Sequence, residues 1–574
     1  MPPPARTPIT PSTAHAPGAR KGSAIWPVLL LVFTCSVLLC TLWRPWLRPL
    51  GGDWAYRELE AMRLRQGQVC YRDFFMHKAP LASYLAAGGQ AAAVALGAEP
   101  LLGTRLVSIL LTGIVVALAA WAWANAEGSR AAGALAGLAF ASMTYVGLST
   151  ASGIEPKMGM LAVGLAAILA AQAGRWVLAG AFTGAAALFW QPGVLFLLAL
   201  APEPLLLAWR DRQRPPQAHR LGTSLRAGVW PWAQMALGFA IPLGLAAAYF
   251  ASQGALRDAW QQAAGFNLPY THSYLLSFGG AVRRFGAIWV AGHGRNLDLL
   301  VLAGSGLCAY LVKRGPNWPA GRPLLTYGLL ALIASLINMQ DASDTVPLLP
   351  VVAPLAGVAI FRALRWLWRR WRADEWLGPL TWRGALALAG GGLVAFGMLD
   401  ALTEQLPYTL EQQRADVHAL VYEHDPSGRV YAPGLPEAVV LTGAPALSRY
   451  PYLYNGVAGW IQATQPGGLR AMMAGVEAKH PGVVLVAKHP AYDPDYAPLY
   501  RWLDAGYKLE AVRIYDYYYL PVPAGFCGAL LHALFPGDDS PFTAGVTIGS
   551  RIWVWRLRTK PIAAQGRVGH AEGR

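Results

Sequence analysis

The chain has 574 residues, of which 55% are hydrophobic and only 14% are charged. About a quarter of the residues in a soluble globular protein are charged, so this composition excludes an ordinary soluble protein of the same length. Many apolar runs approach the ~20 residues that cross a bilayer as a helix. The sequence therefore predicts a polytopic α-helical membrane protein.

The basic residues behind the net charge of +16 cluster in short linkers between apolar runs. Arginines gather in residues 210–220 and again in 362–372, with Lys313 and Arg314 between these clusters. Basic linkers of this kind mark the cytoplasmic side of a membrane protein, whereas nucleic-acid-binding proteins carry a basic polar face. We therefore expect membrane lipid as a partner and no nucleic acid.

The apolar segments predict eleven transmembrane helices and a cytoplasmic N-terminus. Residues 1–23 are rich in Pro, Ser and Thr and predict a disordered cytoplasmic tail. The run at 24–43 lacks a small-residue cleavage site, so we expect it to remain as the first span. The other predicted spans are 104–124, 131–149, 157–173, 176–190, 192–208, 229–251, 297–313, 322–339, 346–361 and 384–400.

The Ala- and Gly-rich segment 79–96 decides the topology. If it crossed the membrane, every later linker would change sides and the basic clusters would lie outside. If it lies in the external leaflet, those clusters all face the cytoplasm, and we expect this arrangement. The predicted transmembrane domain, residues 24–401, then has its first external loop at 44–103 and its C-terminal end outside.

After Asp400 the sequence changes from apolar to mixed polar. Residues 402–558 predict a small extracytoplasmic α/β domain, followed by a disordered tail at 559–574. A disulfide between Cys70 and Cys527 is conceivable outside the cytosol. The expected strands lie at 429–432, 483–487, 510–515 and 551–557, and the expected helices at 408–422, 467–479 and 496–505.

The stretch Gly51–Leu81 follows the first span directly and is dense in ionisable residues. Such groups beside lipid are costly unless they serve a site. Asp53 stands at the start of a short predicted helix that also carries Tyr56, and a carboxylate there can cap free N–H groups. The same predicted external side holds residues 153–157, the tip 190–192, the loop 252–296 and residues 338–344, so charges far apart in sequence are expected to converge.

The order of residues in this loop resembles a known family. Asp53, a short helix, Gly67, Tyr71-x-Asp73-Phe74 and Lys78-x-Pro80-Leu81 follow the first external loop of membrane glycosyltransferases of the GT-C fold. The likeness is greatest to the bacterial, family 39-like branch related to protein O-mannosyltransferases and lipid A aminoarabinose transferases. It implies hexosyl or pentosyl transfer from a polyprenyl-phosphate carrier to a glycan, lipid or protein acceptor, on the extracytoplasmic side of the inner (plasma) membrane.

The resemblance also implies roles for acidic residues. Asp53 is expected to take the proton of the acceptor while phosphate leaves from the opposite face of the sugar, with a plain helix cap as the alternative. Asp73 is the second candidate for this base, unless it only orders the loop. Glu155, at the outer end of a span, is expected to be a second carboxylate of the site or to orient Lys157, with an exposed helix-end charge as the alternative.

Lys78 matches the lysine of the family's Lys-Pro-Pro-Leu motif, although Ala79 replaces the first proline. The resemblance implies that it binds the carrier phosphate, where a cation stabilises the developing negative charge. Arg105 and Arg72 are further phosphate candidates, and anchoring to lipid headgroups is the alternative for such cations. The substrate-binding candidates are Tyr56, His77, Lys157, Asp341 and Asp344.

Two features of the candidate residues limit what the resemblance transfers. Asp341 and Asp344 stand where relatives have a basic–aromatic pair, so the sugar or the acceptor is expected to differ. His77 with Glu155 could bind a divalent cation, but two candidate ligands without motif spacing assign no metal. No other cofactor is expected.

Two other functions remain as alternatives. A transporter or flippase for a lipid-linked glycan would carry charges at the bilayer midplane in broken helices, whereas here they collect in one external loop. An inactive glycan-binding relative would have the same loop without turnover. The sequence favours the transferase but identifies neither its sugar nor its acceptor.

Overall fold

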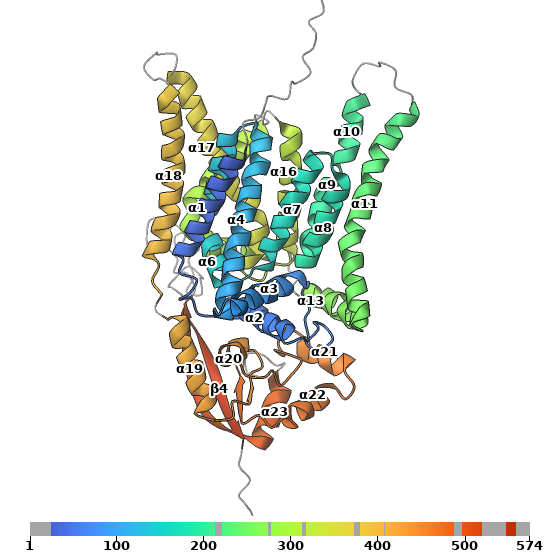
Figure 1. Cartoon of the computed structure of the whole chain (residues 1–574), viewed down its shortest axis with the longest axis vertical. Helices are drawn as coiled ribbons and strands as arrows, with labels where there is room; N and C mark the ends of the chain where they lie inside the picture. Colours follow the sequence, from blue (N-terminus) through green and yellow to red (C-terminus); the bar gives the residue numbers. More distant parts are fainter. Residues whose placement is uncertain are drawn as a thin grey trace, which may run out of the picture.

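The computed structural model describes residues 25–212, 221–273, 277–312, 317–371, 379–406, 408–486, 496–518 and 547–557. A bundle of long helices lies above a smaller α/β domain (Figure 1). The helices of the bundle are α1 (Trp26–Leu42), α4 (Pro100–Glu127), α5 (Arg130–Ala141), α6 (Thr144–Ser152), α7 (Pro156–Gln172), α8 (Trp176–Phe189), α9 (Val194–Leu200), α10 (Glu203–Arg212), α11 (Leu221–Ser252), α15 (Leu297–Val312), α16 (Trp318–Ile337), α17 (Leu349–Trp371) and α18 (Pro379–Thr403).

The prediction of a multi-pass α-helical membrane protein is confirmed. Six of the described helices are long and apolar enough to cross a membrane, and α5 with α6 makes a seventh if this pair, bent by 60°, is one span. Shorter apolar helices of 10–17 residues, among them α1, α7 and α8, complete the bundle. The count of eleven spans stays a prediction, although every predicted span overlaps a helix.

The bend between α5 and α6 is held by side chains of other helices. The Thr144 N–H donates to Asn296 Oδ1 at 2.8 Å, and the Thr144 hydroxyl contacts Asp400. Ser142 Oγ donates to the Leu393 carbonyl at 2.7 Å. A bend frees backbone groups of a membrane helix, and such neighbours satisfy them. The break is therefore part of a packed interior.

Two helices of the first external loop, α2 (Gly52–Arg65) and α3 (Leu81–Ala95), lie across the lower end of the bundle (Figure 1). α3 has only 15 residues and lies across the long axis of the bundle, so it does not run through the bundle as a span. It packs closely on α4, because a Cβ on Gly103 would lie only 2.1 Å from the carbonyl oxygen of Gly89. The segment 79–96 therefore covers the bundle end.

The stretch 252–296, which we expected to be an external loop, is largely helical. It contains α12 (Leu256–Trp260), the π-helix η2 (Gln261–Phe266), α13 (Asn267–Ser273) and α14 (Phe278–His293). Low apolarity argues against a span but not against a helix, so these helices are compatible with a connection between spans, and its external position stays a prediction. The Gln262 side chain accepts from the Met76 N–H at 3.0 Å and donates to the Tyr71 carbonyl at 2.7 Å, so η2 supports the first external loop.

The α/β domain is built on a four-stranded sheet in the order β1-β2-β4-β3. β1 and β2 are parallel, and the other neighbours are antiparallel. The strands and helices lie close to the predicted ranges, and the structure has two further helices, α20 and α21, that were not predicted. Cys527, and with it the predicted disulfide, and the two predicted tails lie outside the described residues. The elements are α19 (Leu410–Tyr422), β1 (Val430–Tyr431), α20 (Pro436–Thr442), α21 (Val457–Thr464), α22 (Gly468–Glu477), β2 (Val483–Val486), α23 (Ala497–Gly506), β3 (Tyr507–Tyr518) and β4 (Thr547–Leu557).

The α/β domain is hydrogen-bonded to the first external loop. The Gln413 side chain accepts from the N–H of Leu50 and donates to its carbonyl, both at 2.6 Å. The Phe75 N–H donates to the Arg449 carbonyl at 2.8 Å. Phe75 also belongs to an aromatic core that contains Tyr452 of the domain. The first external loop therefore lies between the bundle and the α/β domain and contacts both.

Helices α8 and α11 approach each other at backbone contact distance. A Cβ on Gly238 of α11 would lie 2.0 Å from the Val177 carbonyl oxygen, and one on Gly180 of α8 would lie 2.1 Å from that of Met235. Membrane helices associate through such small residues because lipid provides no hydrophobic drive for their packing. The glycines therefore set the separation of this helix pair.

We expect Gly238→Val to force these helices apart at a cost of about 1–3 kcal/mol, typical of overpacking. The measurement is the fraction of purified protein that stays monodisperse in detergent after heating. Gly244→Val on the same helix is the control, because nothing lies within 4 Å of its Cβ position. Equal losses in both variants would contradict the packing explanation.

Candidate active site

Asp53 and Lys78, the leading candidates from the sequence, form an ion pair. Asp53 lies in the first turn of α2, after the N-cap Gly51, so the expected capping by its side chain is not seen. Its carboxylate instead accepts a hydrogen bond from Lys78 Nζ. The side chains are 61% and 27% exposed, respectively, so a substrate can reach the pair.

Nearby cations keep Asp53 ionised. Burial alone would raise the pKa of its carboxyl, but the charges of Lys78 and Arg57 outweigh burial and hold the pKa well below its usual range. Arg57 lies one turn later in α2, is buried, and donates to Glu60 Oε2 at 2.5 Å and to Ser83 Oγ at 3.3 Å. A carboxylate held at low pKa is a weak base, so Asp53 can act as a base only after it leaves Lys78.

Lys157 is the centre of a second charged cluster, at the start of α7. Its Nζ lies 3.0 Å from Asp344 Oδ1 and 3.8 Å from Glu155 Oε1, and 5.1 Å from the centroid of the Trp190 ring. The side chains of Lys157 and Glu155 are only 8% and 6% exposed. A buried cation needs such partners, so Glu155 is not an exposed helix-end charge, and we infer that it helps to orient Lys157.

Asp341 is the N-cap of the 3-10 helix η4 (Ala342–Leu348), and Asp344 lies in its first turn. Asp341 Oδ1 accepts from the Ser343 N–H at 2.7 Å, and Asp344 Oδ2 accepts from the Asp341 N–H at 3.3 Å, so the two residues form a capping box. Asp344 also binds Lys157, whereas Asp341 is exposed. Of these two substrate candidates, Asp341 is therefore the accessible one.

The two charged clusters lie at the same end of the bundle. A Cβ on Gly153, which has φ +150°, would lie 3.2 Å from Trp54 Cδ1, so residues 153–155 abut the start of α2. The charge of Lys157 also contributes to the low pKa of Asp53, after those of Lys78 and Arg57. The structure thus brings together the charges that the sequence placed on one side.

His77, next to Lys78, is anchored by three other segments. Its carbonyl accepts from Gln191 Nε2 at 3.1 Å and from Asn267 Nδ2, and its Nδ1 lies 2.7 Å from the Tyr452 hydroxyl. Burial and the neighbouring charge of Lys78 lower the pKa of His77 to about 3, so its imidazole is neutral. His77 therefore fixes the backbone that presents Lys78.

Asp73 and Arg72 bind each other. Both nitrogens of Arg72 that contact Asp73 lie 2.8 Å from its oxygens, and a further Arg72 nitrogen donates to the Gln253 carbonyl at 2.8 Å. Asp73 also accepts from the Val69 N–H at 2.7 Å. We infer that Asp73 orders the loop and that Arg72 ties the loop to the end of α11.

Arg105 contacts backbone rather than an open anion site. Its guanidinium is buried in α4 and donates to the carbonyls of Pro45 and, at 2.8 Å, of Arg48. We infer that Arg105 fixes the linker between α1 and α2. Among the residues that the structure describes, no group of three or more His, Cys, Asp or Glu side chains is placed to hold a metal ion.

A tyrosine-rich segment of the α/β domain, which was not predicted from the sequence, lies against α2. Tyr454 donates its hydroxyl hydrogen to the Tyr56 hydroxyl at 2.8 Å, and the Tyr452 ring meets the Tyr56 ring edge-on with centroids 4.9 Å apart. Tyr450, Tyr452 and Tyr454 alternate just before an Asn-Gly turn, which is the only local signal. Tyr56 therefore lies at an interface between domains.

The fold of this chain is similar to that of known membrane proteins, although its sequence is not. No family model and no curated protein matches the sequence. Among solved structures, ArnT from Cupriavidus metallidurans in the apo state matches 93% of this chain and 98% of its own, at 14% identity and a TM-score of 0.55. The same protein bound to undecaprenyl phosphate matches 85% and 95%, at 14% identity and a TM-score of 0.51. The chain therefore has the GT-C fold of membrane glycosyltransferases, as its first external loop predicted.

Proposed function

We propose that this protein is an integral membrane glycosyltransferase that takes a sugar from a polyprenyl-phosphate carrier. The accessible ion pair of Asp53 and Lys78 carries the proposal. Inverting transfer from a phosphate needs a base for the acceptor and a cation for the departing oxyanion, and these residues supply both. The undecaprenyl phosphate bound to ArnT, which has the same fold, supports a carrier of this class.

In the proposed reaction the donor phosphate displaces Asp53 from Lys78. Asp53 then loses the cation that lowers its pKa most, so its basicity rises. Asp53 takes the proton of an acceptor hydroxyl, whose oxygen attacks the anomeric carbon as the bond from that carbon to the phosphate oxygen breaks. The lipid phosphate leaves paired with Lys78. Donor binding thus activates the base.

The end of the bundle that carries α2 and α3 is proposed to face the extracytoplasmic side of the inner (plasma) membrane. Arg365, Arg369 and Arg370 lie toward the C-terminal end of α17, at the opposite end of the bundle (Figure 1). Basic residues at span ends mark the cytoplasmic side. The acceptor is a glycan, a lipid or a protein that reaches the outer surface.

A flippase is the second candidate, and the bent pair α5–α6 is the feature that favours it. A transporter uses broken helices to line a path at the midplane. Here the break is filled by Thr144, Asn296 and Asp400, and the paired charges of the candidate site lie at the bundle end. Chemistry at one face fits this arrangement better than alternating access.

Asp53→Asn should lower sugar transfer by at least ~10²-fold, because an amide cannot take the acceptor proton. Binding of undecaprenyl phosphate should persist or tighten, since Lys78 no longer has a carboxylate partner. The assay is release of sugar from a polyprenyl-phosphate donor. Asp73→Asn is the control and should keep most of the turnover. Full turnover in Asp53→Asn would exclude Asp53 as the base, and an inactive wild type would favour the glycan-binding relative.

Lys78→Ala should weaken binding of undecaprenyl phosphate roughly 10- to 150-fold, the equivalent of one lost charge-assisted contact. The folded yield in detergent should not change, because the Lys78 side chain is partly exposed. Arg72→Ala is the matched cation control and should bind the carrier normally. Unchanged affinity in Lys78→Ala would make this lysine a headgroup anchor.

Reporter fusions test the proposed orientation. Fusions after Arg212 and Arg370 should report the cytoplasm, and fusions after Gln262 and Gly467 should report the outside, because the basic linkers stay inside. The measurement is the activity of paired reporters that fold only on one side. A cytoplasmic signal after Gly467 would refute the extracytoplasmic site.

A further inference from the structure

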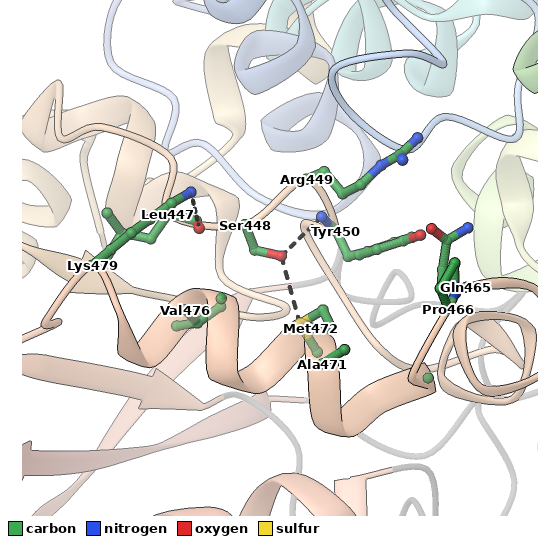
Figure 2. Close-up of a pocket in the computed structure, with 12 residues that line it drawn as sticks. Leu447, Ser448, Arg449, Tyr450, Gln465, Pro466, Ala471, Met472, Val476 and Lys479 are labelled. Atoms are coloured by element: carbon green, nitrogen blue, oxygen red, sulfur yellow. Dashed lines mark hydrogen bonds between the residues drawn. The ribbon is translucent and has the colours of Figure 1, made fainter.

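A groove on the α/β domain lies apart from the site proposed above. It runs between the extended residues 447–450 and helix α22, and Gln465 with Pro466 borders one end (Figure 2). Its volume of about 340 Å³ is within the ~300–1,000 Å³ of small-molecule sites. Nothing lies within 4 Å of a Cβ position at Gly475, so the groove is open along this helix.

Three carbonyls and one N–H of residues 447–450, which form one wall of the groove, are already hydrogen-bonded. The carbonyl oxygens of residues 447–449 accept from Lys479 Nζ at 2.7 Å, from Arg63 at 2.6 Å and from the Phe75 N–H at 2.8 Å. The Tyr450 N–H donates to a serine hydroxyl of the same segment at 3.0 Å. A peptide that adds to a strand needs such groups free. The groove therefore recognises its ligand mainly with side chains.

Those side chains suit a negatively charged saccharide. Tyr450 and Gln465 lie at one end and Lys479 at the other, with Met472 and Val476 between them (Figure 2). The partly exposed Met472 side chain fits the C–H face of a sugar, with Tyr450 and Val476 buried in the floor beneath it. The Gln465 amide and the remaining ammonium hydrogens of Lys479 fit hydroxyl and carboxylate oxygens. None of the twelve lining residues is acidic, and Lys479 supplies a cation at one end of the groove, which favours an anion.

The groove lies directly behind the first external loop. Arg449 points away from the groove and donates to the Tyr71 carbonyl at 2.7 Å (Figure 2). Tyr450, which lines the groove, packs on Phe75 with ring centroids 5.6 Å apart. Lys78 follows Phe75 by three residues. One segment of chain therefore separates a ligand in the groove from the loop that carries the candidate site.

We propose that this groove binds an acidic saccharide, and that this saccharide is the part of the acceptor remote from the hydroxyl that receives the sugar. Binding of the saccharide stands on the groove alone, whereas its role as acceptor rests on the proposed function. Binding energy from a remote part of a substrate positions its reacting end without further groups at the reaction centre. The α/β domain then selects the acceptor while the bundle holds the lipid donor.

Binding of tetragalacturonate and of its full methyl ester to the full-length protein in detergent tests the proposal. These tetrasaccharides differ only in whether their carboxyl groups carry a charge, and the neutral ester should bind about tenfold weaker, for the loss of a charge-assisted hydrogen bond. Ala471→Trp should weaken tetragalacturonate binding by about tenfold or more, because the indole occupies the groove. Ala474→Trp is the matched control, since Ala474 is equally exposed on α22 and lies outside the groove lining. Lys479→Met should weaken binding of tetragalacturonate alone.

Each outcome decides one part of the proposal. Wild-type affinity in Ala471→Trp, or no binding of either saccharide to the wild type, would overturn the groove as a site. Equal affinities for the two saccharides would overturn its preference for an acid. Undecaprenyl phosphate binding should stay normal in Ala471→Trp and fall in Lys78→Ala. A groove that binds tetragalacturonate in a protein without transfer activity would leave the saccharide site standing and overturn its role as acceptor site.

Discussion

The ion pair of Asp53 and Lys78 is the interaction on which the proposed chemistry depends, and it is a weak one. A pair as exposed as this contributes about 0–1 kcal/mol to stability, so it does not hold the loop in place. The loop is held instead by buried contacts on either side, at Arg57 in α2 and at His77. A weak pair on a rigid frame can open for a phosphate while both partners keep their positions.

That frame draws on both domains. Gln191 of the bundle, Asn267 of α13 and Tyr452 of the α/β domain all contact His77, although they are far apart in the sequence. Since the backbone of Lys78 is continuous with that of His77, the cation is positioned before a ligand arrives. Positioning in advance lowers the cost of ordering a site when substrate binds. The α/β domain is thus a structural part of the candidate site.

The sequence predicted the fold and named Asp53 and Lys78 as separate candidates, because ionisable residues stand out against an apolar background and their order matched a family loop. It could not distinguish Arg105, whose donors bind carbonyls, from an arginine that binds phosphate, because both are basic residues near a span end. It also missed Tyr452, because no local pattern reveals a contact between distant segments. The helices in residues 252–296 were not predicted, because the apolarity of this stretch fits neither a span nor a loop motif.

The ion pair lies where the first external loop meets both the bundle and the α/β domain. In the proposed reaction the lipid-linked donor approaches from the bundle, because it is confined to the bilayer, whereas the proposed acceptor saccharide arrives from the water along the α/β domain. Lys78 follows the segment clamped to that domain, and Asp53 begins the helix that lies across the bundle end. The two proposed substrates then meet where the loop joins the two domains. Both residues of the pair come from the loop of the bundle, and the α/β domain contributes by holding the segment that precedes Lys78.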